Sequence, residues 1–483
     1  MRRAALRCLL LITALVATVL VYSSCRGEHE KTEAEKTPPP VERPNLILVI
    51  ADDLDKSVFE RSTLDSPWVS EGASFTNAVA TTPLCCPSRA SILRGQYAHN
   101  TTLWRNENGQ PNGGAAYFRE NKLDQQTVAT ILHADGYKTW FGGKYLNGYY
   151  TAGGSQGYVP PGWDSWQAYL SPTTANVDGR ATSFFPQHYT DWLSERAETF
   201  MEDQRGSSQP FYMHIAPFDT HEPLTIPPRH EAAYPEQRAP RPPSFDEADI
   251  SDKPAYVRDE SPVSKRRTAE YDQLQVERMR SALTLEDLCR NVIDTLERTN
   301  QLDDTYLIFT SDNGYHMGLH RMKAPKGLPY VASHEVPFVV RGPDVPAGES
   351  FDQLVANIDI APTVLDLAGI KDLSWMDGRS FGAFLDGTAP ESWRTSLLIE
   401  NMESPGERRP RPAYSGVRHQ DEVYVEYESG EKEYYDLRAD PYQLESRPQD
   451  APQTMESELA GLRDCAGDGC RRADRPYRVA GAS

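Results

Sequence analysis

The hydrophobic positions of the chain alternate between short apolar runs and longer stretches with helical spacing. The first run, residues 45–51 (NLILVIA), is almost continuously apolar, which is typical of a strand covered on both faces. Comparable runs predict further strands at residues 137–141, 210–216, 305–310 and 337–341. Helices are predicted between them, at residues 126–134, 182–203 and 271–299. Strands separated by helices indicate an α/β fold with a mostly parallel central sheet between helix layers.

The pattern changes near residue 385. Before it, the Pro-rich residues 222–262 predict a long loop at one edge of the sheet. After it, short apolar runs joined by turn residues predict strands at 415–418, 422–427 and 433–437. We therefore expect a large domain, of the size of an enzyme's catalytic domain, at 44–385. A small C-terminal α+β domain with an antiparallel sheet is expected at 386–483.

The first 25 residues differ from the rest of the chain, because three arginines precede an apolar run at residues 9–21. This pattern predicts an export signal at residues 1–25. The signal is either cleaved or a bacterial lipoprotein signal in which Cys25 is lipidated and attaches the protein to a membrane. Residues 26–43 are charged and Pro-rich, which predicts a disordered tether. We expect a protein that is secreted or anchored at the cell envelope.

Composition limits the remaining classes. With 39% hydrophobic residues, 24 Tyr and 8 Trp in 483 residues, the chain is neither disordered nor a multi-span membrane protein. Its 50 basic and 70 acidic side chains leave a net charge of -20, which repels nucleic acid. A site for an anionic substrate must therefore concentrate positive charge locally.

The seven cysteines fit an exported protein. Cys465 and Cys470 lie close enough in sequence to form a disulfide in an oxidising exterior, with free thiols as the alternative. Cys289 falls in a helical pattern and is predicted to be buried. Cys85 and Cys86 are adjacent, and their segment contains no partner cysteine.

Acidic and amide side chains follow two of the predicted strands. Asp52, Asp53 and Asp55 follow the first strand, and Asp312 and Asn313 follow the strand at 305–310. Ligand sites of open α/β sheets lie at the carboxyl ends of the strands. Such oxygen ligands suit Ca²⁺ or Mg²⁺ better than Zn²⁺. The alternative is that these residues merely cap the helices that follow.

The segment 84–95, LCCPSRASILRG, resembles the signature of the sulfatase family, Cys-x-Pro-Ser-Arg-x-x-x-Leu-x-Gly. The resemblance is to the formylglycine-dependent sulfatases of the alkaline-phosphatase-like superfamily and implies that fold. It implies that Cys85 is oxidised to formylglycine (3-oxoalanine) by a formylglycine-generating enzyme. The hydrated aldehyde is then the nucleophile, and loss of a proton from its second hydroxyl expels sulfate.

Other family motifs occur in the family's order from residue 44 to about residue 441, including GKY at 143–145, HEP at 221–223 and DNG at 312–314. The variants CCPSR, GKYLN and DNGYH are similar to the glucosamine-6-sulfatase and extracellular endosulfatase branch. The resemblance implies one Ca²⁺ held by Asp52, Asp53, Asp312, Asn313 and the modified Cys85. It implies that Arg89 holds the nucleophile, that Lys144, His221 and Lys326 surround the sulfate, and that His221 or Lys326 protonates the departing alcohol.

The chain departs from the family at Leu146, where many members have a histidine that takes the proton when sulfate is expelled. Leucine cannot accept a proton, so another base is required. His316, two residues after the DNG turn, is our choice, and His99 is the second candidate.

The sequence thus predicts a sulfuric ester hydrolase that acts on a sulfated carbohydrate, with sulfated amino sugars favoured, or on an aryl sulfate. One alternative is a phosphatase or phosphodiesterase of the same superfamily, although those enzymes use Ser or Thr as the nucleophile. Another is a non-catalytic lipoprotein that binds sulfated glycans, if Cys85 stays unmodified.

Overall fold

The computed structural model describes residues 43–62, 67–388, 390, 392–403, 411–474 and 476–478. The predicted signal at 1–25 and the tether up to residue 42 lie outside the described residues. The chain from Arg43 onward forms one compact unit, and the predicted domain boundary near residue 385 stays a prediction.

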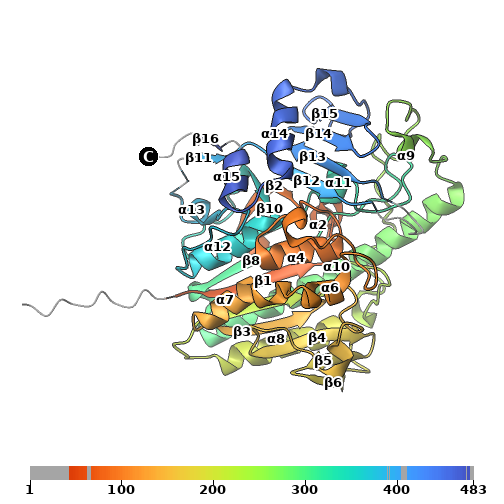
Figure 1. Cartoon of the computed structure of the whole chain (residues 1–483). Helices are drawn as coiled ribbons and strands as arrows, with labels where there is room; N and C mark the ends of the chain where they lie inside the picture. The colour runs from red at the N-terminus through yellow and green to blue at the C-terminus, as the bar shows by residue number, and fades with distance from the viewer. Residues whose placement is uncertain are drawn as a thin grey trace, which may run out of the picture. The chain divides into compact units, whose positions relative to one another are not determined.

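A ten-stranded sheet forms the centre of this unit (Figure 1). In spatial order its strands are β10 (Ser350–Ala356), β2 (Ala73–Val79), β9 (Phe338–Arg341), β8 (Thr305–Ser311), β1 (Asn45–Ala51), β7 (Phe211–Ala216), β3 (Lys138–Gly143), β4 (Ser165–Ser171), β5 (Thr174–Val177) and β6 (Arg180–Ser183). The run from β8 to β4 is parallel, whereas β9, β5 and β6 are antiparallel to their neighbours. This confirms the predicted mostly parallel sheet.

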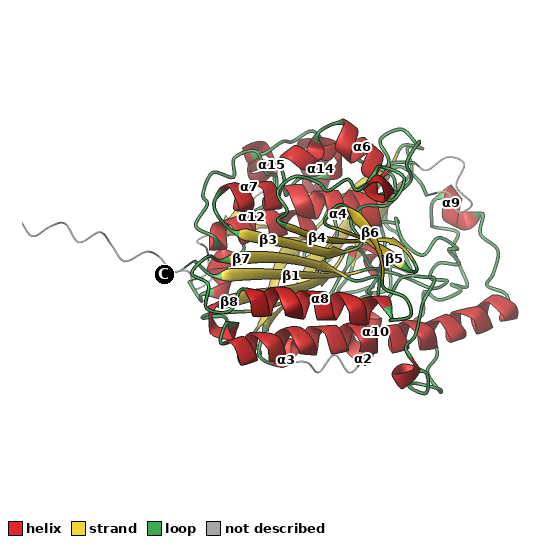
Figure 2. Cartoon of the chain, turned by 90° about the horizontal axis from the view of Figure 1, so that it is seen from below, coloured by secondary structure: helices red, strands yellow, loops and turns green. Residues whose placement is uncertain are grey.

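Helices cover both faces of the sheet (Figure 2). One layer contains α2 (Lys56–Arg61), α3 (Pro67–Ser70), α8 (Tyr189–Asp203) and the long α10 (Lys265–Thr299). The other contains α4 (Cys85–Arg94), α6 (Gly114–Glu120), α7 (Val128–Ala134) and α12 (Ile360–Leu367). The apolar residues of β1 alternate between the layers: Ile47 and Val49 pack in the core with α8 and α10, and Leu48 packs in the core with α7 and α12. Burial on both faces explains why β1 reads as a continuous apolar run.

The C-terminal part adds a small antiparallel sheet. Its strands are β12 (Leu397–Asn401), β13 (Tyr414–Arg418), β14 (Glu422–Tyr427) and β15 (Lys432–Asp436), followed by helices α14 (Gln453–Arg463) and α15 (Asp468–Ala473). A separate pair joins β11 (Ser392–Arg394) to β16 (Pro476–Arg478). The short helices are α5 (Ala98–Thr101), α9 (Ala255–Arg258), α11 (Val331–His334) and α13 (Gly382–Leu385). Val79 and Leu354 of the large sheet pack in the same core as this small sheet.

The predicted helix at 182–203 is wrong in its first part. Residues 180–183 form β6, an exposed edge strand, and α8 begins only at Tyr189 after Pro186. Proline cannot donate the backbone hydrogen bond that a helix interior requires. The predicted loop at 222–262 is confirmed as mostly irregular backbone. Within the described residues, no helix combines the length and apolar character that crossing a membrane requires.

Candidate active site

The carboxyl ends of β1 and β8 bring the predicted oxygen ligands together. These strands are adjacent and parallel, with Ala51 opposite Ser311. The amide nitrogen of Asp312 donates to the carbonyl oxygen of Ala51 at 3.1 Å. The amide nitrogen of Asp53 donates to Oδ1 of Asp312 at 3.1 Å. Asp53 has a φ of 62°, a left-handed conformation that aspartate tolerates better than most residues. The chain therefore turns sharply at Asp53, and this turn brings its backbone against the carboxylate of Asp312.

Cys85 is the first residue of α4 and lies against these carboxylates. Its Sγ is 3.7 Å from Oδ1 of Asp52 and 3.8 Å from Oδ1 of Asp53. Nζ of Lys326 lies 2.7 Å from the same sulfur. The N-cap residue Leu84 makes no side-chain hydrogen bond to α4, and the amide of Cys86 donates to Oδ1 of Asn106 at 2.9 Å. The positive end of the helix dipole lies beside Cys85. The nucleophile candidate therefore lies between a carboxylate group and a cationic group.

Three further predicted side chains, two of them cationic, surround the carboxylates. Nε of Arg89, one turn after Cys85, lies 2.8 Å from Oδ2 of Asp312. Nζ of Lys144, just after β3, lies 2.6 Å from Oδ2 of Asp52. Nε2 of His221 lies 3.8 Å from Oδ2 of Asp53, and its side chain is 30% exposed. Of these three side chains, His221 is therefore the one most accessible to solvent.

Gly143 allows the backbone of Lys144 to pack closely against Ala216 at the end of β7. Gly143 has a φ of +116°, and a Cβ at this position would lie 2.0 Å from the carbonyl oxygen of Ala216. The amide nitrogen of Lys144 donates to that carbonyl at 2.7 Å. A side chain at position 143 would therefore push β3 away from β7 and displace Lys144.

The charges at the site shift several pKa values. Burial alone would raise the pKa of Asp52, but Lys144, His221 and the other cations outweigh burial and hold it below its ordinary value. Burial raises the pKa of the Cys85 thiol to about 12, although Lys144 and Lys326 oppose the shift. Cys85 is therefore a neutral thiol at neutral pH, and an unmodified cysteine is a poor nucleophile here.

The oxygen atoms that gather at this site, from Asp52, Asp53 and Asn313, fit a hard divalent cation. The ligand atoms of Asp52, Asp53, Cys85 and His221 all lie within 4.8 Å of one another. Oδ1 of Asn313 is buried and has no hydrogen-bond partner among the described residues, although the Nδ2 group of the same side chain donates to Asp53 at 2.7 Å. A buried amide oxygen beside carboxylates has the chemistry of a ligand for a hard cation such as Ca²⁺.

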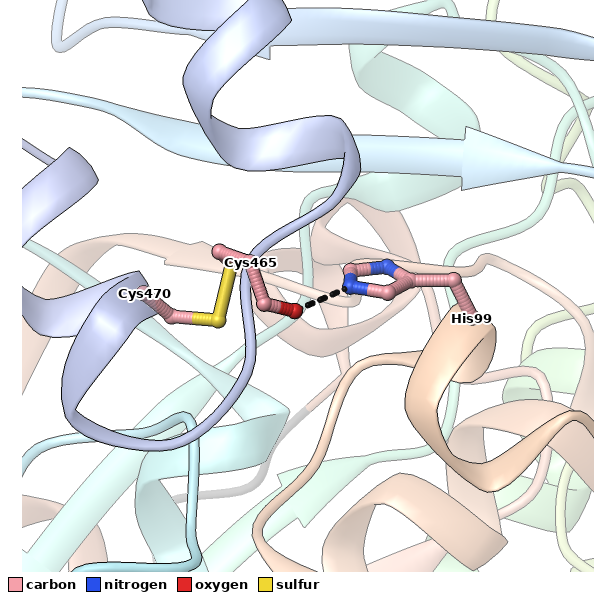
Figure 3. A group of neighbouring side chains, drawn as sticks. All are labelled: His99, Cys465 and Cys470. Atoms are coloured by element: carbon pink, nitrogen blue, oxygen red, sulfur yellow. Dashed lines mark hydrogen bonds between the residues drawn. A yellow bond between two sulfur atoms is a disulfide. The ribbon is translucent and has the colours of Figure 1, made fainter.

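A second group of potential ligands does not form a metal site. His99, Cys465 and Cys470 lie together, but the two cysteines form a disulfide (Figure 3). This confirms the predicted bond. Sulfurs joined in a disulfide are not thiolate ligands. The free cysteines Cys86 and Cys289 are buried, as predicted for Cys289.

The two candidate bases, His99 and His316, make no hydrogen bond to the predicted metal ligands among the described residues. Nδ1 of His99 lies 3.0 Å from Oε2 of Glu400, and Nε2 lies 2.9 Å from the carbonyl oxygen of Cys465, so this ring is bound toward the C-terminal part. Both ring nitrogens of His316 are buried and make no hydrogen bond to the described residues. His316 lines a cavity of about 320 Å³ together with Asp55. Its role in sulfate release stays a prediction.

The sequence did not point to Arg278, which contacts the loop that carries Asp53. Arg278 lies in the middle of α10 and is fully buried between Val276 and Met279, which are themselves buried. Its Nη2 donates to the carbonyl oxygen of Asp53 at 2.7 Å. The available signal was a charged residue on the apolar face of a predicted helix, which requires a buried partner.

Comparison of the sequence with models of known protein families assigns the chain to a family. A family model described as Sulfatase covers residues 44–370, more than half of the chain. The chain belongs to the sulfatase family. It is a sulfuric ester hydrolase with an alkaline-phosphatase-like fold. A second model, N-sulphoglucosamine sulphohydrolase, C-terminal, matches residues 322–461.

Individual relatives agree with this assignment. The chain is 32% identical over 482 residues to N-acetylglucosamine-6-sulfatase of Capra hircus, across 89% of this sulfatase and 85% of the relative. It is 28% identical to the extracellular sulfatase SULF-1 homolog of Drosophila melanogaster, across 83% of this chain but 38% of that relative. A solved structure of a protein in complex with its substrate D-glucosamine-2-N,6-O-disulfate superposes with a TM-score of 0.73. That match, at 22% identity, covers 87% of this chain and 96% of the other and shows the shared fold.

Proposed function

We propose that this sulfatase removes 6-O-sulfate from N-acetylglucosamine residues of sulfated glycans. One observation carries the proposal: three cationic side chains, Arg89, Lys144 and Lys326, and the imidazole of His221 gather around Cys85 and its carboxylates in a protein whose net charge is -20. Such a site attracts an anionic ester despite the acidic surface. The N-acetylglucosamine-6-sulfatase relative, which aligns along most of the chain, supports the choice of sugar.

We propose that Cys85 is converted to formylglycine, and that Asp52, Asp53, Asp312 and Asn313 would hold one Ca²⁺. The thiol that the structure contains then stands in place of the hydrated aldehyde. Bound Ca²⁺ would supply a Lewis acid that activates the nucleophile and polarises the sulfate. Asp312 keeps Arg89 in place beside the nucleophile, because their side chains form an ion pair that is almost fully buried.

The remaining side chains of the site bind the sulfate and protonate the departing alcohol. Lys144 is held by Asp52 and is 6% exposed, so its role is to bind and orient the sulfate oxygens. Lys326 contacts both Asp53 and Cys85 at the base of the site. Of the two candidates for the general acid, His221 is the more exposed, with 30% of its side chain accessible against 9% for Lys326. His221 is therefore our choice to protonate the departing alcohol oxygen.

Two measurements test the proposal. Mass spectrometry of the peptide containing residue 85, from protein produced with a formylglycine-generating enzyme, should show a loss of about 18 Da or its hydrate. Sulfate release should be faster from N-acetylglucosamine-6-sulfate than from 2-O-sulfated or N-sulfated sugars, with 4-nitrophenyl sulfate as an aryl control. A converted protein that is inactive on every 6-O-sulfate but cleaves 4-nitrophenyl phosphate would instead favour a phosphatase.

We also propose that the protein is exported. The N-terminal pattern of residues 1–25 supports this, together with the extracellular sulfatase among its relatives. Metabolic labelling with a fatty acid tests the lipoprotein form, because label incorporation should disappear in Cys25→Ala. Label that persists in this variant would exclude Cys25 as the attachment site.

A further inference from the structure

We propose that Arg278 is a positioning residue that sets the Ca²⁺ affinity of the site without contacting the cation itself. The inference rests on the proposed calcium site. It starts from the position of Arg278 on α10, whose side chain is fully buried. A buried guanidinium is costly unless hydrogen-bond acceptors and negative charge compensate for the lost water. The groups that it contacts therefore indicate what it does.

Arg278 binds the loop after β1 at two points. Its Nη2 donates to the carbonyl oxygen of Asp53 at 2.7 Å and lies 2.6 Å from Oδ2 of Asp55. Asp53 adopts the left-handed conformation with a φ of 62°. A hydrogen bond to its carbonyl fixes the rotation of the following peptide and so stabilises this turn. Arg278 thus acts on the backbone of a residue whose carboxylate faces Cys85.

The same side chain reaches the two neighbouring loops. Its Nη1 donates to the carbonyl oxygen of Thr220 at 3.4 Å, in the loop that carries His221. Its guanidinium carbon lies 4.1 Å from the ring centre of Tyr315, in the loop after β8. The hydroxyl of Tyr315 in turn donates to Glu222 at 3.0 Å. One guanidinium therefore joins the loops after β1, β7 and β8, and each of these loops supplies side chains to the site.

A second residue of α10 supports this arrangement one turn later. Oγ of Ser281 donates to Oδ1 of Asp219 at 2.6 Å. The carbonyl of Asp219 accepts from the amide of Asp52 at 2.9 Å, and the amide of Thr220 donates to the carbonyl of Asp52 at 2.8 Å. Arg278 and Ser281 lie three residues apart and so share a helix face. This face of α10 supports both Asp52 and Asp53 from outside the cation site.

Planar, forked hydrogen bonding explains why arginine is required. Lysine would keep the charge but has one nitrogen in place of the fork. Methionine would remove the charged donor from both groups, which would leave the Asp53 carbonyl to the Thr220 hydroxyl at 3.3 Å and the Asp55 carboxylate to the Val58 amide at 3.1 Å. Residues that orient metal ligands typically change metal affinity by about 10–100-fold when they are replaced. We expect Arg278→Met to raise the Ca²⁺ dissociation constant by about that factor, with Arg278→Lys between Met and wild type.

The test is calorimetric titration of the purified full chain with Ca²⁺, which needs neither formylglycine nor catalytic turnover. Arg394→Lys is the matched control, because Arg394 is also buried but pairs with Asp359 and Asp474. We expect this control to lower the melting temperature without changing Ca²⁺ affinity more than about twofold, because its partners are not metal ligands.

Equal affinity losses in the Arg278 and Arg394 variants would reduce the effect to general destabilisation and overturn the inference. Wild-type affinity in Arg278→Met would overturn it too, as would a wild-type chain that binds no Ca²⁺. Normal Ca²⁺ binding by a wild-type protein that cleaves no sulfate ester would refute the proposed function alone.

Discussion

The ion pair between His99 and Glu400 makes the stability of the fold depend on pH. His99 lies on α5, just after the nucleophile helix, and is 16% exposed. One ring nitrogen faces the Glu400 carboxylate at 3.0 Å and the other faces the carbonyl oxygen of Cys465 at 2.9 Å. The carboxylate and the carbonyl are both acceptors, so only the protonated ring, which has two N–H donors, satisfies both. Nε2 also lies 3.2 Å from the Nδ2 group of Asn100, which donates to the same Cys465 carbonyl at 2.9 Å. Burial would lower the pKa of His99, but Glu400 and the Cys465 carbonyl raise it to about 9.

The sign and size of the effect follow from linkage. The folded pKa of about 9 lies above the ordinary value of 6.5, so protonation of His99 stabilises the fold. At 1.36 kcal/mol per pKa unit, the stabilisation is on the order of 3 kcal/mol below pH 6.5. It decreases as the pH rises through about 9 and is close to zero by about pH 10.

The experiment compares wild type and His99→Gln by urea unfolding at several pH values from 6 to 10. The difference in unfolding free energy should shrink by roughly 2–3 kcal/mol across this range. His133→Gln is the control, because His133 is 50% exposed beside Asp164, and exposed pairs contribute at most about 1 kcal/mol. A wild-type-minus-variant difference that stays constant from pH 6 to pH 10 would refute the assignment of a charged His99.

Three further predictions concern the catalytic site. Cys85→Ala should lower sulfatase turnover by at least about a thousandfold, whereas Cys86→Ala, which only removes a packed thiol, should keep turnover within about tenfold; the reverse order would identify Cys86 as the nucleophile. Asp312→Ala should lose bound Ca²⁺ by elemental analysis together with activity, and full activity or one zinc per chain in wild type would contradict the ligand assignment. His316→Ala should accumulate sulfated residue 85 during turnover, seen by mass spectrometry, whereas His334→Ala, which removes another buried histidine with no hydrogen-bond partner among the described residues, should not. Unchanged steady-state turnover in His316→Ala would exclude this histidine as the base.

Sequence reasoning reached the ligands because they follow strands that are buried on both faces. A continuous apolar run such as β1 marks its own end, and Asp52 and Asp53 stand directly after it. The strands β2 and β10 lie at one side of the sheet, and several of their polar residues are exposed or half-exposed. For this reason the hydrophobic pattern did not predict them. Their periodicity is weaker, and only pairing with neighbours distant in sequence makes them strands.

The contacts of Arg278 were beyond sequence reasoning for a different reason. They depend on where α10 crosses the loops after β1 and β7, and no local pattern specifies that crossing. The assignment of His316 had a similar weakness, because spacing along the chain placed it near the ligands without stating which way its ring points. The structure places that ring at the wall of a cavity with Asp55.

The burial of Cys85 has a consequence for the order of events during biosynthesis. Its side chain is 0% exposed, and Lys326, which covers its sulfur, lies 241 residues further along the chain. An enzyme that oxidises Cys85 must reach it before this second segment folds over it. At about 5–20 residues per second, synthesis of the intervening chain takes roughly 12–48 s. The proposed conversion of Cys85 therefore competes with folding, and slowing translation between these residues should raise the converted fraction.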